Sequence, residues 1–257
     1  MRGFGEGGDK AEPHSPFDKT TMSSAERADL LSSEHRRESS DTATRAEAHA
    51  LGSGRSDVPR TFDKLPDGRE IIVIGDVEGC KQYNHPQGDN DRDYLQTCGL
   101  VSSEDVLNQY GQNVTENDIV EFAAANSLCE VIPNKPLESG GTLDSDISEI
   151  LTAHHVPAKA KVLTHEELAS YVEQGHSAIA AVNAGIIWDD ATYFQSGEPN
   201  HAVTVTGIAR NAENGRQEGV YINDSRGWPE DSGRFIPMDK WQPAWAVVTD
   251  KPRDFGP

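Results

Sequence analysis

A cysteine, a histidine and an aspartate follow one another along this sequence in an order that suits nucleophilic catalysis by a thiol. Cys98 lies in the motif TCG at 97–99, where the pattern predicts the start of a helix, and the positive end of a helix favours the thiolate form. His201 opens a predicted strand in the motif NHAV at 200–203, and Asp224 ends the following one. His201 could therefore act as base for the thiol while Asp224 orients the imidazole.

Each of these residues also has a purely structural interpretation when it is taken alone. Free cysteine is among the most buried residue types, a histidine can be a satisfied core residue, and an aspartate commonly initiates a turn. The surroundings favour catalysis, because Gly99 would let a backbone approach the Cys98 thiol and a polar loop at 89–93 precedes it. Strand alternation makes His201 the polar end of an otherwise apolar face.

The elements that must position these residues fall into a helical part and a strand-rich part. A short strand at 70–74 and a long loop at 75–97 come first, and helices are then predicted at about 98–110, 116–126, 144–154 and 165–174. Two of the helices have capping signals, Thr115 with Asp118 and Thr164 with Glu167.

The later part of the sequence is predicted to form strands. They are expected at 178–182, 202–209, 219–224, 234–236 and 244–249, separated by turn residues. Helices followed by strands indicate an α+β fold with two halves and a cleft between them.

The motifs around the three candidate residues resemble those of the papain-like cysteine peptidases. The segments concerned are TCG at 97–99, NHAVTVTG at 200–207 and YINDSRGW at 221–228, and the resemblance spans roughly 70–250. It is strongest to the bacterial C39-like branch, in which aspartate replaces the asparagine of papain, and there to domains of toxins delivered between bacteria.

This resemblance implies a papain-like α+β fold and a peptidase activity. A helical half would carry Cys98, and an antiparallel β half would carry His201 and Asp224. Cleavage would proceed through a thioester acyl-enzyme. The family also implies a tryptophan that shields the contact between histidine and acid, for which Trp228 is the candidate; the other tryptophans are expected in the core or the cleft wall.

The family further implies a glutamine upstream of the cysteine, whose side-chain amide completes the oxyanion hole with the Cys98 backbone N–H. The family spacing of six residues falls on Arg92, so an insertion in the loop 88–96 is required. Gln87 and Gln96 are both nearby. Gln87 is favoured, because Gln96 is too close to the cysteine to turn its amide back toward the thiol.

Composition divides the chain into two regions. Residues 1–66 contain few large apolar side chains and are predicted to be a disordered arm or linker, because they cannot bury enough surface to offset the entropy of ordering. Residues 67–257, roughly 190 residues, suffice for one domain with a core, which is predicted to be the peptidase.

Charge limits the partners that this domain is expected to bind. The chain has a formal net charge of −20, and residues 67–257 contain 13 basic and 31 acidic residues, so most of the charge lies there. A negative field repels phosphates, which disfavours nucleic acid and anionic membranes as partners and favours a basic peptide or protein. The alternative is simply a solvated acidic surface.

Three cysteines, Cys80, Cys98 and Cys129, are too few and too scattered for a disulfide framework or a zinc site. No metal or other cofactor is expected, and the domain should work in a reducing cytoplasm.

The sequence shows neither a signal-peptide pattern nor an apolar stretch of about 18 residues. We therefore expect a protein secreted or delivered into a target cell by another route.

Three functions are compatible with these features. The first is a cysteine endopeptidase that acts as an antibacterial effector on a protein of the target cell, and a cognate inhibitor protein would be its expected further partner. The second is a glutamine deamidase or transglutaminase toxin, because the same three groups can attack a side-chain amide. The third is a binding module with an inactive site, which the intact set of Cys98, His201 and Asp224 disfavours.

Overall fold

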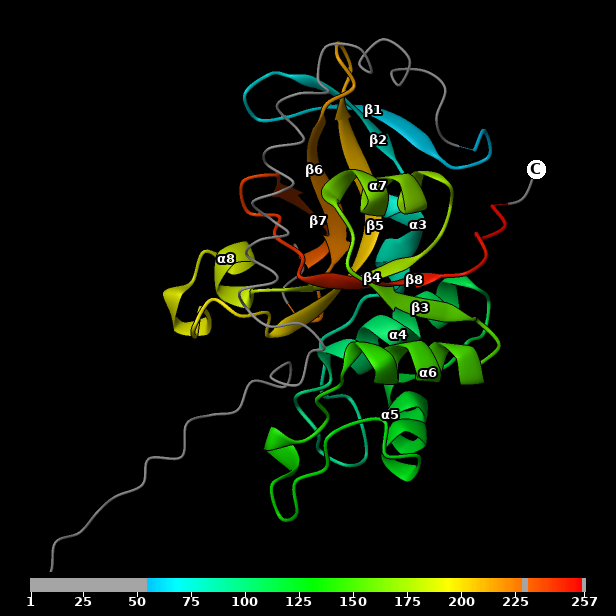
Figure 1. Ribbon diagram of the computed structural model, residues 1–257, viewed down its shortest axis with the longest axis vertical. Coiled ribbons are helices and arrows are strands. Elements are labelled where there is room, and N and C mark those ends of the chain that lie inside the picture. Colours follow the sequence, from blue (N-terminus) through cyan, green and yellow to red (C-terminus); the bar gives the residue numbers. More distant parts are fainter. Residues whose placement is uncertain (1–54, 228–230, 256–257) are drawn as a thin grey trace, which may run out of the picture.

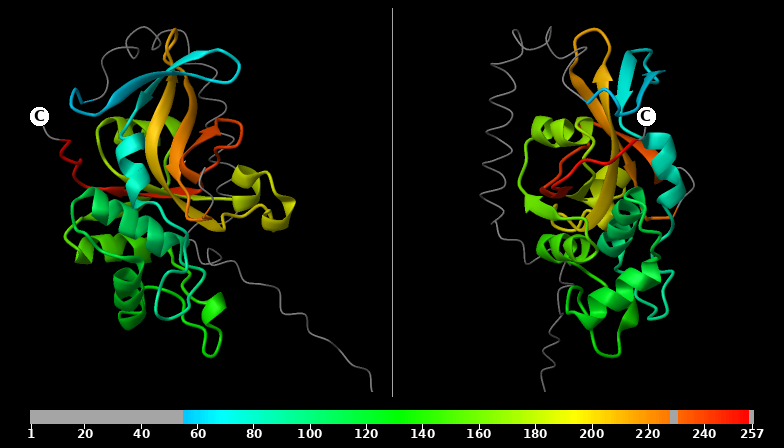
Figure 2. Two further views of the ribbon diagram at one scale, coloured as in Figure 1. Left: turned by 180° about the vertical axis from the view of Figure 1, so that it is seen from behind. Right: turned by 90° about the vertical axis from the view of Figure 1, so that its right-hand side faces the viewer.

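Helices α4 (Cys98–Gln109), α5 (Glu116–Ala125) and α6 (Asp144–Ala153) gather at one end of an antiparallel sheet in this computed structural model, which describes residues 55–227 and 231–255 (Figure 1). The views from behind and from the side show the same segregation of helices α4, α5 and α6 from the long strands (Figure 2). The α+β layout expected from the order of apolar patterns is therefore confirmed.

The strands of the described residues all pair antiparallel and form one sheet in the order β1-β2-β5-β4-β8-β3, with β6 between β5 and β7. Their bounds are Arg60–Lys64 (β1), Glu70–Ile74 (β2), Ala158–Lys161 (β3), Ala178–Val182 (β4), His201–Asn211 (β5), Gln217–Asn223 (β6), Ser232–Pro237 (β7) and Trp245–Thr249 (β8). The long strand β5 pairs with β4 through its first half and with β2 through its second. Strand β5 also packs against α4.

The helices of the described residues are mostly short and amphipathic. They are Val77–Cys80 (α3), Cys98–Gln109 (α4), Glu116–Ala125 (α5), Asp144–Ala153 (α6), His165–Glu173 (α7) and Ala184–Trp188 (α8), with 3₁₀ turns at Lys81–Tyr83 (η1), Pro136–Glu138 (η2) and Ala191–Tyr193 (η3). Both predicted capping boxes are present, at Thr115 with Asp118 and at Thr164 with Glu167.

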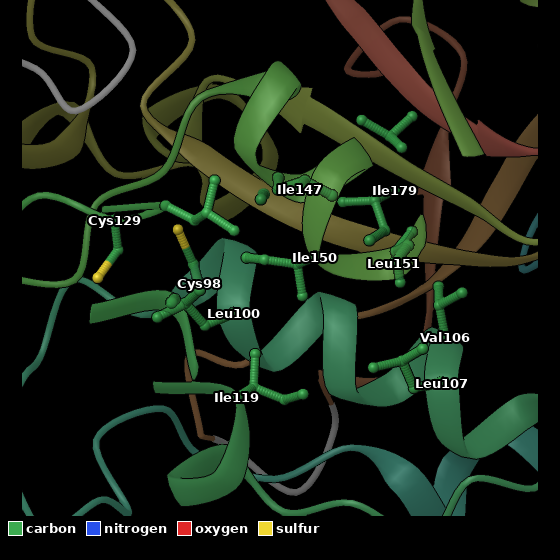
Figure 3. Close-up of a cluster of buried hydrophobic side chains, with 14 of the residues drawn as sticks. Cys98, Leu100, Val106, Leu107, Ile119, Cys129, Ile147, Ile150, Leu151 and Ile179 are labelled. Carbon is green, nitrogen blue, oxygen red and sulfur yellow. The ribbon is translucent and has the colours of Figure 1, made fainter. Parts of the chain in front are cut away.

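Helix α4 is the central element of the helical half. Ten of its residues, from Cys98 to Leu107, are buried, and it contacts α5, α6 and β5. Its apolar side chains join those of α5 and α6 and one face of the sheet in a core that includes Cys98 and Cys129 (Figure 3). A second apolar cluster on the other face of the sheet involves α7, so β5 is buried on both faces.

The structure contains elements that the sequence did not predict. Helix α3 and η1 lie in the predicted long loop at 75–97, and β3 and α8 were not expected. Strand β3 reads AKAK, and α8 reads AGIIW. Both are too short for their periodicity to be distinguished from that of a loop.

Residues 55–66, which the sequence assigns to the arm, belong to the folded region. Strand β1 pairs with β2, and Val58 and Leu65 are only 2% and 8% exposed. The fold therefore begins earlier than the predicted boundary at residue 67. The sequence pattern did not indicate β1, because it is an edge strand with five exposed side chains and no apolar alternation. The remaining residues of the predicted arm, 1–54, lie outside the described residues.

Removing residues 1–66 should therefore destabilise the domain. Burial of Val58 and Leu65 contributes about 1.5–3 kcal/mol each, which corresponds to a fall in Tm of roughly 10 °C at this size. Thermal unfolding of the fragment 67–257 should be compared with that of 55–257, which retains β1. Equal Tm values for the two fragments would show that β1 does not stabilise the fold.

Candidate active site

Cys98 is the first residue of α4 and is 7% exposed. Thr97 occupies the cap position without a side-chain hydrogen bond to the helix, so its hydroxyl does not compete for the N–H groups of the first turn. The thiol thus lies at the positive end of a helix of 12 residues.

Gly99 is required by a close approach, although not the one that the sequence suggested. A Cβ atom at this position would lie 2.1 Å from Oγ1 of Thr142, so the neighbour that approaches the backbone here is the segment before α6. Any larger residue at position 99 would push α4, and with it Cys98, away from this segment.

His201 and Asp224 meet at the end of the sheet beside α4. His201 is the first residue of β5, and Asp224 directly follows β6, which pairs with β5. The Nε2 atom of His201 lies 2.7 Å from Oδ1 of Asp224, and the two residues are 4% and 0% exposed. The Cys98 thiol lies close enough to His201 to raise the pKa of its imidazole. Because Nε2 faces the carboxylate, Nδ1 is the nitrogen left for the thiol.

The electrostatics of this group favour an ionised pair. Burial acts to lower the pKa of His201, but the charge and hydrogen bond of Asp224, together with the nearby Cys98, outweigh it and raise the pKa above the ordinary value. Burial acts to raise the pKa of Asp224, yet the charge and hydrogen bond of His201 lower it. These surroundings therefore favour the positively charged form of His201 beside the ionised Asp224.

The other two cysteines lie in different surroundings. Burial raises the pKa of Cys80 and of Cys129 to about 11 each. Both thiols therefore stay protonated near neutral pH. Of the three cysteines, Cys98 is the one that raises the pKa of a histidine paired with a carboxylate.

Trp188, at the end of α8, is a site residue that the sequence did not single out. Its Nε1–H donates to Oδ2 of Asp224 at 2.7 Å, and its ring lies 5.0 Å from the ring of His201. Arg226 covers the Trp188 ring at 4.5 Å, and its backbone N–H donates to Oδ1 of Asp224 at 3.0 Å. Trp188 thus covers the contact between His201 and Asp224, whereas Trp228, the sequence-based candidate, lies outside the described residues.

The Gln87 side chain is held between the segment before Cys98 and the turn after Asp224. Its Oε1 accepts a hydrogen bond from the hydroxyl of Ser225 at 2.9 Å, and its backbone N–H donates to the Ser225 carbonyl at 2.9 Å. Its Nε2 donates to the carbonyl of Leu95. An amide nitrogen carries two hydrogens, so this contact uses one of them.

The other candidates near the cysteine have partners away from the turn that follows Asp224. Gln96 donates through Nε2 to the carbonyl of Leu137 at 3.2 Å. Arg92, at the family spacing, forms a two-pronged ion pair with Glu121 of α5. Gln87 is therefore the glutamine that lies against the turn carrying the candidate acid.

Residues 55–227 and 231–255 contain no cluster of three or more His, Cys, Asp or Glu side chains that could hold a metal ion. Within the same ranges, no helix has the length and apolar character needed to cross a membrane.

Replacing Trp188 by phenylalanine should impair the site without removing the aromatic cover. Loss of a hydrogen bond to a charged group costs about 1.5–3 kcal/mol, which corresponds to roughly a 10- to 100-fold lower kcat/KM if the bond serves to hold Asp224. The control is Trp241→Phe, the same substitution at a fully buried core position. If both variants retain wild-type kcat/KM, Trp188 does not support the carboxylate.

Comparison with known proteins places this chain in a known sequence family. Residues 74–250 match the model of the Peptidase C39 like family. Two uncharacterized proteins, from Mycobacterium tuberculosis (strain ATCC 25618 / H37Rv) and Mycobacterium bovis, are each 31% identical over 236 residues, which cover 81% of this chain and 94% of the relative. A solved double-glycine-motif protease from an AMS/PCAT transporter, in complex with the leader peptide, aligns with a TM-score of 0.39 and 17% identity over 61% of this chain and 86% of its own.

Proposed function

The chain belongs to the Peptidase C39 like family and is a cysteine peptidase, and on this premise we propose that Cys98, His201 and Asp224 are its catalytic triad. The observation that carries the proposal is the buried pair of His201 and Asp224, 2.7 Å apart, to which the Cys98 thiol at the start of α4 is close enough to raise the pKa of the imidazole. These groups come from α4, β5 and the turn after β6, and they meet only in the folded protein.

In the proposed reaction, the Cys98 thiolate attacks the carbonyl carbon of a peptide bond, and the carbonyl π electrons move to oxygen. The backbone N–H of Cys98 and the second Nε2 hydrogen of Gln87 stabilise this oxyanion. Ser225 supports this role for Gln87, because its bond to Oε1 fixes the amide plane.

The tetrahedral intermediate collapses when His201 gives its Nδ1 proton to the leaving amine, which leaves a thioester on Cys98. His201 then takes a proton from water, and the hydroxide attacks the thioester. The second collapse releases the thiolate and the carboxylic acid product, which loses its proton to solvent. Asp224 stays ionised throughout and holds the imidazole by Nε2.

A role as an antibacterial effector that cleaves a protein in a target cell is the finer part of this proposal. It is supported by the resemblance of the motifs around Cys98, His201 and Asp224 to those of delivered toxins. The excess of acidic residues favours a basic region in the substrate. Production of the wild type, but not of Cys98→Ala, inside a bacterial cell should stop its growth, and a cognate inhibitor protein, if present, should prevent this.

Proteolysis is tested by incubating the protein and its Cys98→Ala form with a bacterial lysate and sequencing the new protein N-termini. New N-termini that appear only with the wild type are expected. Modified glutamines that are heavier by about 1 Da, without new N-termini, would instead indicate a deamidase. No difference between the two forms would contradict catalysis on bacterial proteins.

A further inference from the structure

A buried carboxylate on α5 binds the segment that directly follows Gln87. Glu116 is 2% exposed, and its Oε1 accepts hydrogen bonds from the backbone N–H of Gly88 at 2.9 Å and from Nδ2 of Asn90 at 3.0 Å. Its Oε2 accepts from the backbone N–H of Asp89 at 2.8 Å and of Gly88 at 3.1 Å. A buried carboxylate is tolerated only with such partners, so this contact fixes the loop strongly.

Helix α5 does not need Glu116 for its own start. The capping box of Thr115 and Asp118 already provides the side-chain cap at that end of the helix, with bonds to the N–H groups of Asp118 and Thr115. The Glu116 carboxylate instead reaches a segment 26 to 28 residues earlier in the sequence. Its burial is therefore explained by the loop rather than by the helix.

The other side of Gln87 is fixed as well, by His85. The Nε2 atom of His85 lies 2.7 Å from Oε2 of Glu104 on α4, and its Nδ1 lies 2.9 Å from the Pro86 carbonyl. Both ring nitrogens thus face acceptors, which requires a hydrogen on each and therefore an imidazolium. Its Nδ1 is 3.9 Å from Oε2 of Glu116, so one positive charge lies between two buried carboxylates.

The turn between these two anchors depends on a glycine. Gly88 has a φ of +103°, a conformation that side chains other than glycine rarely adopt, and a Cβ atom there would lie 2.7 Å from the Leu95 side chain. This turn brings the Gly88 N–H to Glu116 while Gln87 keeps its contacts with Ser225 and Leu95. The position of the Gln87 amide is thus coupled to α5.

We propose that Glu116 is a positioning residue for catalysis, which holds the loop 88–90 and thereby orients the Gln87 amide toward the oxyanion. The inference rests on the oxyanion role of Gln87 proposed above. Glu116 touches neither the substrate nor the reacting atoms, and it acts through the loop. Misplacing a reacting or stabilising group by about 1 Å can reduce the rate 100-fold.

The test measures two reactions of the same thiol in Glu116→Ala, Glu116→Gln and Gln87→Ala. Hydrolysis of benzyloxycarbonyl-glycine p-nitrophenyl ester passes through an oxyanion, whereas alkylation of Cys98 by iodoacetamide does not. Glu116→Ala should lower kcat by about 10- to 100-fold, with KM changed less than about 3-fold and the alkylation rate changed less than about 2-fold. Glu116→Gln keeps one acceptor oxygen, so its kcat should fall less than that of Glu116→Ala.

Two further variants make the result specific. Glu121→Ala removes the half-exposed carboxylate of α5 that pairs with Arg92 of the same loop, and it should retain wild-type kcat. The double variant Gln87→Ala/Glu116→Ala should be no slower than Gln87→Ala, because the two residues act through one group.

Three results would overturn the inference: multiplied losses in the double variant, a fall in alkylation that matches the fall in kcat, or an unchanged kcat in Glu116→Ala. An unchanged kcat in Gln87→Ala would remove the oxyanion role on which the inference rests. If Cys98 is not the nucleophile, Cys98→Ala remains active, and this result distinguishes that case from all of the others. If Glu116→Ala does not fold, the same comparison is made with Glu116→Gln.

Discussion

Replacing Cys98 or His201 by alanine is expected to lower kcat/KM at least about 10⁴-fold, because the nucleophile and its base act as a unit. The loss should appear in kcat, and the two single variants should be about as inactive as the double variant. Hydrolysis of the same p-nitrophenyl ester gives the measurement.

Cys129→Ala is the matched control for this prediction, since Cys129 is 8% exposed and Cys98 is 7% exposed. Cys129 packs in the same apolar core, and its variant should lose stability but keep kcat below its Tm. Equal activity in Cys98→Ala and Cys129→Ala would exclude Cys98 as the nucleophile.

Asp224→Ala should retain partial activity, with kcat/KM lowered by roughly 10²- to 10⁴-fold, because an orienting residue contributes less than nucleophile or base. The loss should also depend on pH. Asp224 raises the pKa of His201, so its removal lowers that pKa, and the imidazolium deprotonates at lower pH. The alkaline limb of the pH profile of kcat/KM is therefore expected to move to lower pH.

Asp224→Asn separates orientation from charge. Its carbonyl oxygen can still accept the Nε2–H of His201, whereas its amide nitrogen would face the Trp188 donor. We expect a smaller loss of kcat/KM than in Asp224→Ala and the same shift of the alkaline limb. An unchanged alkaline limb in both variants would show that Asp224 does not set the charge state of His201.

The elements that the sequence predicted are those whose signals are local. The capping boxes at Thr115 and Thr164 define helix starts by contacts within four residues, and the apolar run at 178–182 is buried on both faces. Strand β1 was missed because an edge strand buries little and its sequence shows no alternation. The domain boundary was misplaced for the same reason.

The site shows the same division between local and long-range information. The positions of Cys98 at a helix start and His201 at a strand start follow from motifs, and the pairing of β5 with β6 follows from the turn between them. The contact of Trp188 with Asp224 joins residues 36 apart, on elements that no local pattern connects. The support of the Gln87 loop by Glu116 is equally long-range, and a buried glutamate at a helix start has no distinct sequence signal.

The central claim is that His201 activates Cys98, and the rate of alkylation of the individual thiols at pH 6 tests it most directly. Iodoacetamide labelling followed by peptide mass spectrometry should show Cys98 reacting at least about 100-fold faster than Cys129, whose pKa burial raises to about 11. In His201→Ala this advantage should disappear. Equal labelling of Cys98 and Cys129 in the wild type, or an advantage that survives in His201→Ala, would contradict the proposed catalytic triad.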